Sequence, residues 1–252
     1  MKLIVPQSTL ILKHKIFSKG NIIFIHGFGS CSFNAIKLLT NLFQKGFNVY
    51  AFDLPNHGKN SDYATQLTVD EYISFSIQKI KSFNLKKFFL MGHSMGGGIV
   101  SYIGSEFPTQ IKGMILLSPF NYGAAIHTKR KIASFGIKLL GPFSTLLSPW
   151  LSKKPDNSSF NPKKLFLDLF SDETINKINY QCPKYTGPLL VVVGTNDMVI
   201  NPVYTKEYFD EKEKDNANYS LYTIQNCTHS TQVGEIPEIT NLIVKFCKKY
   251  KK

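Results

Sequence analysis

Four short apolar runs, at residues 21–25, 88–91, 188–193 and 219–224, predict buried β-strands. The run at 188–193 is continuous, without the polar alternation of a half-exposed strand, and such runs are typical of parallel strands covered on both faces. Helical patterns occupy the intervals between the runs. An order of strands alternating with helices predicts an α/β fold with a mostly parallel central sheet and helices on both faces.

Two helical patterns are the clearest. Thr68 with Glu71 three residues later predicts a capping box, and the apolar positions of that helix continue to Ile80. Residues 236–250 predict a closing helix with a lysine-rich end. The length of 252 residues suits one domain over 1–252, and no internal repeat or linker divides the chain.

The alternation stops between Pro119 and Pro188, an interval too long for a simple connection. We therefore predict an insertion over about residues 121–185. Residues 132–151 are apolar with a single charge, Lys138, and Gly and Pro break them into short helices. Residues 163–177 predict one amphipathic helix whose inner side carries four apolar residues, Leu165, Phe166, Leu169 and Phe170.

The run at 88–91 leads into Gly92, Ser94 and Gly96 and then into a small-residue helix start. This pattern predicts a nucleophile elbow, in which a serine on a tight strand-to-helix turn points out of the sheet. The two glycines allow the chain to double back closely. The amide of Met95, at the helix N-terminus, could stabilise an oxyanion. The segment therefore indicates a hydrolase.

Three other loops follow apolar runs and supply the remaining chemistry. Residues 26–29 form a glycine-bracketed loop in which the Phe28 amide could be a second oxyanion donor. Asp197 follows the run at 188–193, and His229 follows the run at 219–224. The chain order Ser, Asp, His is the order expected for a catalytic triad on this kind of sheet.

These motifs resemble the α/β-hydrolase superfamily, and within it the esterase and monoacylglycerol-lipase-like branch. The resemblance spans about residues 20–250 and rests on residues 26–27, 53–58, 92–97 and the Asp197 and His229 loops. Residues 113–119 also resemble the strand after the elbow helix. The family implies that the insertion at about 121–185 is a helical cap over the active site. One departure is Asn56, where many relatives carry Gly. Neither Asp53 nor His57 is expected to be catalytic.

The catalytic assignment gives each group one role. Ser94 is the expected nucleophile, His229 the base, and Asp197 the group that holds the imidazole tautomer. His93 is assigned to substrate binding, with packing or hydrogen bonding as its alternative. Three cap residues are also assigned to substrate contact, with packing of the cap onto the core as the alternative: Leu139, Phe143 and Leu147.

The composition limits the classes of partner that the sequence indicates. The formal charge is +13, but arginine occurs only at Arg130, so a surface selected for reading nucleic acid is not indicated. A weak attraction to anionic lipid headgroups stays open. The scattered cysteines, at 31, 182, 227 and 247, indicate reduced, buried thiols. We expect no cofactor and no metal, because the histidines never fall in ligand-like pairs. The expected location is cytoplasmic, with contact at a membrane surface open, and the oligomeric state is undetermined.

The predicted function is hydrolysis of carboxylic esters, with a small-molecule ester or lipid as substrate, such as a monoacylglycerol or lysophospholipid, through an acyl-enzyme on Ser94. Two alternatives stay open. The same triad could cleave another bond, as in an aminopeptidase, a thioesterase or a carbon–carbon hydrolase. The fold could also serve a protein that only binds a ligand.

Overall fold

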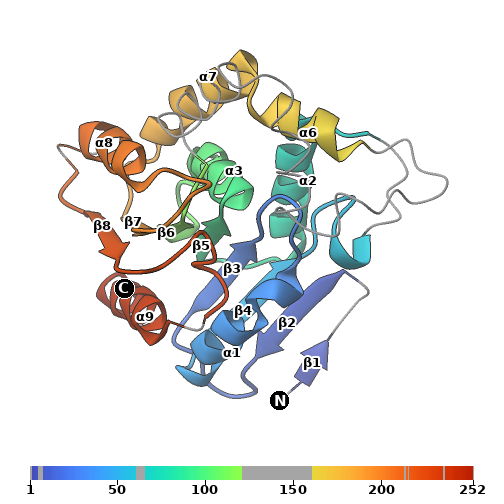
Figure 1. Ribbon diagram of the computed structural model, residues 1–252. Coiled ribbons are helices and arrows are strands. Elements are labelled where there is room, and N and C mark those ends of the chain that lie inside the picture. The colour runs from blue at the N-terminus through green and yellow to red at the C-terminus, as the bar shows by residue number, and fades with distance from the viewer. Residues whose placement is uncertain are drawn as a thin grey trace.

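The computed structural model describes residues 2–4, 8–60, 66–120, 161–212, 214, 216–234 and 236–251. Within these residues one eight-stranded sheet has the order β1-β2-β4-β3-β5-β6-β7-β8 (Figure 1). The strands are β1 (Lys2–Ile4), β2 (Thr9–Lys13), β3 (Asn21–Ile25), β4 (Asn48–Phe52), β5 (Phe88–His93), β6 (Ile111–Leu117), β7 (Leu189–Gly194) and β8 (Tyr219–Ile224).

Strands β3 to β8 are parallel, while β1 and β2 form an antiparallel extension at one side of the sheet. In the centre, Ile22 of β3 lies between Val49 of β4 and Phe89 of β5. Strands β3 to β7 are almost entirely buried, as their continuous apolar runs predict. Because these strands are parallel, their carboxyl ends meet at one edge of the sheet.

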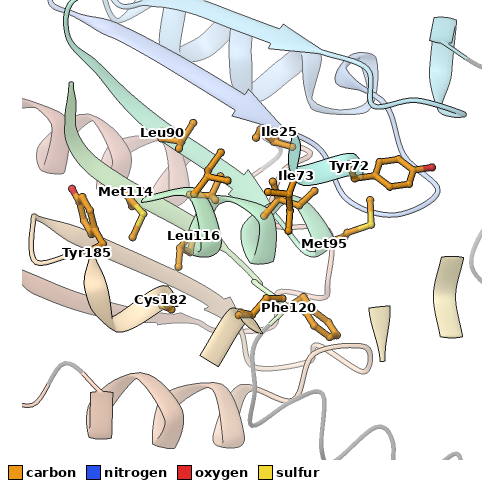
Figure 2. Packing of buried hydrophobic residues seen from close by; sticks show 14 of the residues in the cluster. Ile25, Tyr72, Ile73, Leu90, Met95, Met114, Leu116, Phe120, Cys182 and Tyr185 are labelled. Atoms are coloured by element: carbon orange, nitrogen blue, oxygen red, sulfur yellow. The ribbon is translucent and has the colours of Figure 1, made fainter. Parts of the chain in front are cut away.

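Helices cover both faces of the sheet, as predicted (Figure 1). One face packs against α1 (Ile36–Gln44) and α9 (Pro237–Lys249). The other face packs against α2 (Val69–Ser82), α3 (Met95–Ile103), α6 (Pro162–Leu169), α7 (Asp172–Gln181) and α8 (Pro202–Lys212). Figure 2 shows this second layer, where Leu90 and Leu116 of the sheet and Ile73 of α2 belong to one buried cluster.

The predicted helix starts and ends are largely confirmed. Thr68 and Glu71 form the expected capping box at α2, and α9 falls within the predicted range 236–250. The prediction of one helix over 163–177 is wrong, because α6 ends at Leu169 and α7 begins at Asp172. Ser171 is extended and its side chain accepts a hydrogen bond from the Thr174 amide, so it caps a second helix.

Leu165 and Leu169, predicted on the inner side of this segment, are buried in the core, while Phe166 and Phe170 are half-buried and Phe170 packs against the core. The predicted cap contacts Leu139, Phe143 and Leu147 lie outside the described residues. The cysteines, all of which lie in the described ranges, form no disulfide, and Cys31 is half-buried where a buried thiol was expected. In the part of the chain that is described, no helix is long and apolar enough to cross a membrane.

Candidate active site

Three predicted site residues come directly after parallel strands. Ser94 follows β5 and Asp197 lies three residues beyond β7, while His229 lies in the loop after β8. All three loops therefore leave the same edge of the sheet, which is where α/β proteins place their binding sites. A surface hollow of about 410 Å³, lined by Lys87, Lys112 and Lys249 among others, lies at the opposite ends of β5 and β6 and is too far from this chemistry to serve it.

Ser94 occupies a strained turn between β5 and α3. Its backbone has φ 52° and ψ −121°, outside the regions that non-glycine residues usually adopt. The turn is held by the Ser94 amide, which donates to the Leu117 carbonyl at 3.0 Å, and by the Ser94 carbonyl, which accepts from the Phe120 amide at 2.9 Å. The backbone therefore has the shape expected of a nucleophile elbow.

The glycines around Ser94 are required by close backbone contacts. A Cβ at Gly92 would lie 2.3 Å from the Gly96 carbonyl oxygen, and one at Gly96 would lie 2.3 Å from the Ile25 carbonyl oxygen. A Cβ at Gly27 would lie 2.9 Å from Ser94 Cβ, so the loop after β3 runs directly beside the serine. This contact places the backbone that carries the predicted oxyanion donor Phe28 next to the elbow.

Asp197 and His229 form a hydrogen-bonded pair. His229 Nδ1 lies 2.9 Å from Asp197 Oδ2, and the Asp197 side chain is fully buried while that of His229 keeps about a fifth of its surface exposed. The other carboxylate oxygen, Oδ1, accepts from the amides of Val199 at 2.9 Å and Ile200 at 2.8 Å. These bonds fix the carboxylate, and its partner is the Nδ1–H tautomer of His229.

The pKa of Asp197 is lowered from its ordinary value. Burial on its own raises this pKa, but the hydrogen bond and charge of His229, the Ile200 amide and the Ser118 hydroxyl outweigh burial. Asp197 is therefore a carboxylate at neutral pH. A buried anion beside an imidazole stabilises the imidazolium that forms when the ring accepts a proton.

The loops that carry this pair are bonded to one another. The Asn196 amide donates to the Cys227 carbonyl at 2.9 Å, and the Asn226 amide donates to Thr195 Oγ1 at 2.9 Å. His93, the residue before the elbow serine, is buried, and its Nε2 lies 2.8 Å from the His229 carbonyl oxygen. This contact favours the packing and hydrogen-bonding alternative for His93, because the ring joins the elbow to the histidine loop.

The loop after β3, which carries the predicted oxyanion donor Phe28, is held by residues of the segment after β4. His26 Nε2 accepts from the Leu54 amide at 2.9 Å, and its Nδ1 donates to the Gly27 carbonyl at 2.8 Å. Asp53 Oδ1 accepts from the Ser32 amide at 2.7 Å, and Oδ2 accepts from the Lys59 amide at 2.9 Å. Asp53 is thus a buried acceptor of backbone amides, a structural role that fits the expectation that it is not catalytic.

An aromatic ring of α6 and another directly after that helix lie beside the loop that carries Phe28. The Phe28 ring is 6.0 Å from the Phe166 ring, which in turn is 4.7 Å from the Phe170 ring. Phe170 also contacts Phe120, which follows the strand after the elbow helix. The described end of the predicted insertion therefore brings apolar side chains next to the loop that carries Phe28.

One residue of the site was not predicted. Ser118 directly follows β6 and is fully buried, and its hydroxyl is among the groups that lower the pKa of Asp197. In the sequence, Ser118 is recognisable only as a polar residue at the end of an apolar run. Asp197 is 79 positions later in the chain, and no local pattern relates the two residues. Across the described ranges, no three His, Cys, Asp or Glu side chains are grouped to hold a metal ion.

Three buried histidines predict that acid destabilises the protein. Burial is the main cause that lowers the pKa of His26, of His57 to about 3 and of His93 to about 3. The unfolded chain takes up these protons near pH 6.5, whereas the folded chain does so only at lower pH. The free energy of unfolding should therefore fall as pH drops from about 6.5 toward 3, and urea unfolding at a series of pH values measures it.

A matched variant distinguishes the contribution of the histidines to this pH dependence from the contribution of the carboxylates. His57→Gln keeps an N–H donor but does not titrate, so its free energy of unfolding should fall less steeply over the same pH range. Equal pH slopes for the variant and the wild-type protein would contradict the assignment.

Comparison with known proteins gives consistent similarities. A sequence profile described as alpha/beta hydrolase fold matches residues 20–137. A protein of Mycoplasma pneumoniae provisionally named esterase/lipase 2 is 30% identical over 206 residues, which is 75% of each chain. The fold is similar to that of Paleococcus ferrophilus monoacylglycerol lipase, with 21% identity and a TM-score of 0.69 over 99% of this chain and 100% of that one. It is also similar to Est816, described as an N-acyl homoserine lactone degrading enzyme, with 18% identity and a TM-score of 0.72 over 97% of this chain and 100% of that one.

Proposed function

This chain belongs to the esterase/lipase branch of the α/β-hydrolase family, and on that premise we propose that it is a serine hydrolase that cleaves carboxylic esters through an acyl-enzyme on Ser94. The observation that carries the proposal is the 2.9 Å hydrogen bond between His229 and the buried Asp197. It lies in loops tied to the strained Ser94 elbow through His93.

In the proposed reaction, Ser94 Oγ attacks the ester carbonyl carbon and its proton passes to His229 Nε2. Asp197 holds the proton on Nδ1, so that Nε2 presents its lone pair, and it stabilises the imidazolium. Collapse of the tetrahedral intermediate expels the alcohol, which takes the proton from Nε2. Water then repeats the sequence on the acyl-enzyme and releases the acid.

The developing oxyanion is proposed to be bound by the Met95 and Phe28 amides, at about 3 kcal/mol per donor. Met95 is the first residue of α3, where amides lack helical partners and the helix dipole favours negative charge. Support for Phe28 comes from the 2.9 Å approach that a Cβ at Gly27 would make to Ser94 Cβ. His26 and Asp53 hold that loop.

The proposed substrate is a small ester or a lipid, and the insertion at about 121–185 is proposed to cover the site as a cap. Support comes from its described end, where the α6 residue Phe166 contacts the Phe28 ring. Such rings offer apolar surface to an acyl chain, worth about 0.8 kcal/mol per buried methylene. Thioesters, amides, carbon–carbon bonds and pure ligand binding remain the alternatives.

A chain-length series tests the substrate class. We expect kcat/KM to rise from acetyl to about octanoyl nitrophenyl esters, with an aminoacyl anilide cleaved far more slowly. Phe166→Ala should flatten this rise while acetyl ester hydrolysis changes little. The control Leu167→Ala lies on the exposed side of α6 and should keep the rise.

Faster cleavage of the anilide than of any ester would instead identify an amide hydrolase. Binding of acyl chains without hydrolysis of any substrate in the series would identify a ligand-binding protein. A Phe166→Ala variant that loses activity equally at all chain lengths would show that this ring only packs the fold.

A further inference from the structure

We infer that the end of the molecule opposite the candidate active site is a docking surface for an anionic lipid bilayer. It is formed by the loop between β2 and β3, residues 14–20, with the segments where β5 and β6 begin and the chain end after α9 (Figure 1). These segments adjoin the amino ends of the parallel strands, whereas Ser94, Asp197 and His229 follow the carboxyl ends. We call this region the amino-edge surface.

The β2–β3 loop presents two adjacent apolar side chains to solvent. Ile16 is fully exposed, and Phe17 keeps 67% of its surface exposed. The loop that carries them is nevertheless anchored to the fold. The His14 amide donates to Asn48 Oδ1 at 2.9 Å, and the centroid of the His14 ring lies 4.2 Å from that of Phe43 in a stacked pair. An anchored loop that leaves large apolar side chains uncovered favours a partner with an apolar interior.

Lysine side chains lie beside this apolar pair. Lys251 Nζ is 5.3 Å from the centroid of the Phe17 ring, within the range of a cation–π contact, and the Lys112 side chain donates to the Lys251 carbonyl. Lys112 also lines the surface hollow of about 410 Å³ described above, together with Lys87 and Lys249. The exposed apolar loop and the lysine-lined hollow therefore belong to one continuous surface.

The amino-edge surface lacks compensating negative charge. Neither residues 14–20 nor the described residues that line the hollow include an aspartate or a glutamate. Within the described ranges, none of its lysines forms an ion pair with a carboxylate. Positive charge around exposed apolar side chains fits a bilayer with anionic headgroups, because the lysines meet phosphates while Ile16 and Phe17 enter the boundary of the acyl chains.

Nucleic acid and soluble anions fit this surface less well. Its basic residues are lysines, whereas arginine, with its forked donors, suits the bidentate recognition of phosphate. A soluble anion also leaves Ile16 and Phe17 exposed to water. A bilayer bound at the amino edge does not cover Ser94 at the other edge of the sheet, so the surface serves attachment and leaves the candidate active site facing the solution.

Vesicle co-sedimentation tests the inference on the whole protein without any substrate. We expect binding to vesicles of phosphatidylglycerol and phosphatidylcholine that weakens as NaCl is raised above about 0.1 M, and little binding to phosphatidylcholine alone. Ile16→Ser combined with Phe17→Ser should lower the partition coefficient at least about 10-fold. The matched control, Leu167→Ser with Val203→Ser, removes two exposed apolar side chains of α6 and α8 and should keep the binding.

A second pair of variants tests the charge. Lys112→Gln combined with Lys251→Gln should lower the partition coefficient by several-fold. Lys164→Gln with Lys206→Gln makes the same change in net charge on α6 and α8 and should lower it much less. The Ile16 and Phe17 variant should keep the wild-type melting temperature and kcat on nitrophenyl butyrate, because both side chains are exposed and remote from Ser94.

Three results would overturn the inference. The first is absence of binding of the wild-type protein to the anionic vesicles, or equal binding of the Ile16 and Phe17 variant. The second is loss of binding in the Leu167 and Val203 control alone, which would place the membrane contact near the active site. The third is tighter binding to a duplex oligonucleotide than to the vesicles, unchanged in the Ile16 and Phe17 variant, which would identify a nucleic-acid surface.

Discussion

Replacing Ser94 with Ala should lower kcat on a short nitrophenyl ester by about 10⁶-fold, since the serine oxygen is the atom proposed to form the acyl-enzyme. A residual rate above that of water is expected, because the oxyanion donors and the binding surface remain. Hydrolysis of nitrophenyl butyrate, followed spectrophotometrically, measures the loss. A serine-directed phosphonate should label the wild-type protein at Ser94 and leave the variant unlabelled.

Ser101→Ala is the matched control for this variant. Ser101 lies on the same helix, α3, and its hydroxyl bonds only to the Gly97 carbonyl at 2.9 Å among the contacts described. Its removal should leave kcat nearly unchanged. Turnover of the Ser94→Ala variant at a rate similar to that of the wild-type protein would exclude the acyl-enzyme mechanism.

Asp197→Asn should lower kcat by about 10⁴-fold while the protein stays folded. The amides of Val199 and Ile200 both donate to Oδ1, so the asparagine oxygen should keep that position. Its NH₂ group then faces His229 Nδ1, which must become an acceptor and move its proton to Nε2. The imidazole can no longer accept the Ser94 proton.

The measurement is kcat and the melting temperature for Asp197→Asn, beside Asp210→Asn as the control. Asp210 is a half-buried carboxylate on α8 that pairs with Lys206 and accepts from the Tyr219 hydroxyl at 3.2 Å. Asparagine keeps an acceptor for Tyr219, so this change should leave kcat nearly unchanged and alter the melting temperature little. A rate for Asp197→Asn within a few-fold of the wild-type rate would show that this carboxylate does not set the histidine tautomer.

The parts of the fold that follow from short-range sterics could be predicted from the sequence. The elbow is one example, because Gly92 and Gly96 are required by contacts within a few residues of Ser94 and at the adjacent strand. The parallel core is another example, because short continuous apolar runs that alternate with helices are typical of parallel strands buried on both faces. The α/β-hydrolase resemblance, which rests on these motifs, is confirmed by the family to which the chain belongs.

Features that depend on distant partners could not be predicted. Ser118 lies 113 positions from Thr231, and Asp53 meets Ser32 only because β3 and β4 are neighbours in the sheet. The segment 163–177, predicted as one helix, forms two helices because the Ser171 side chain binds the Thr174 amide and so begins a second helix. Apolar periodicity continues through this cap and does not reveal it. Asn56, the departure from the family pattern, has φ 60°, a conformation that asparagine tolerates in place of glycine.

The most direct test of the proposed mechanism is to trap the intermediate. The protein is mixed with excess nitrophenyl butyrate, quenched with acid within the first turnovers, digested and analysed by mass spectrometry, while nitrophenol release is followed in parallel. A butyryl group on Ser94, with an initial burst approaching one nitrophenol per protein molecule, is the predicted result. Steady hydrolysis with no acyl group on Ser94, or with the acyl group on another side chain, would contradict it.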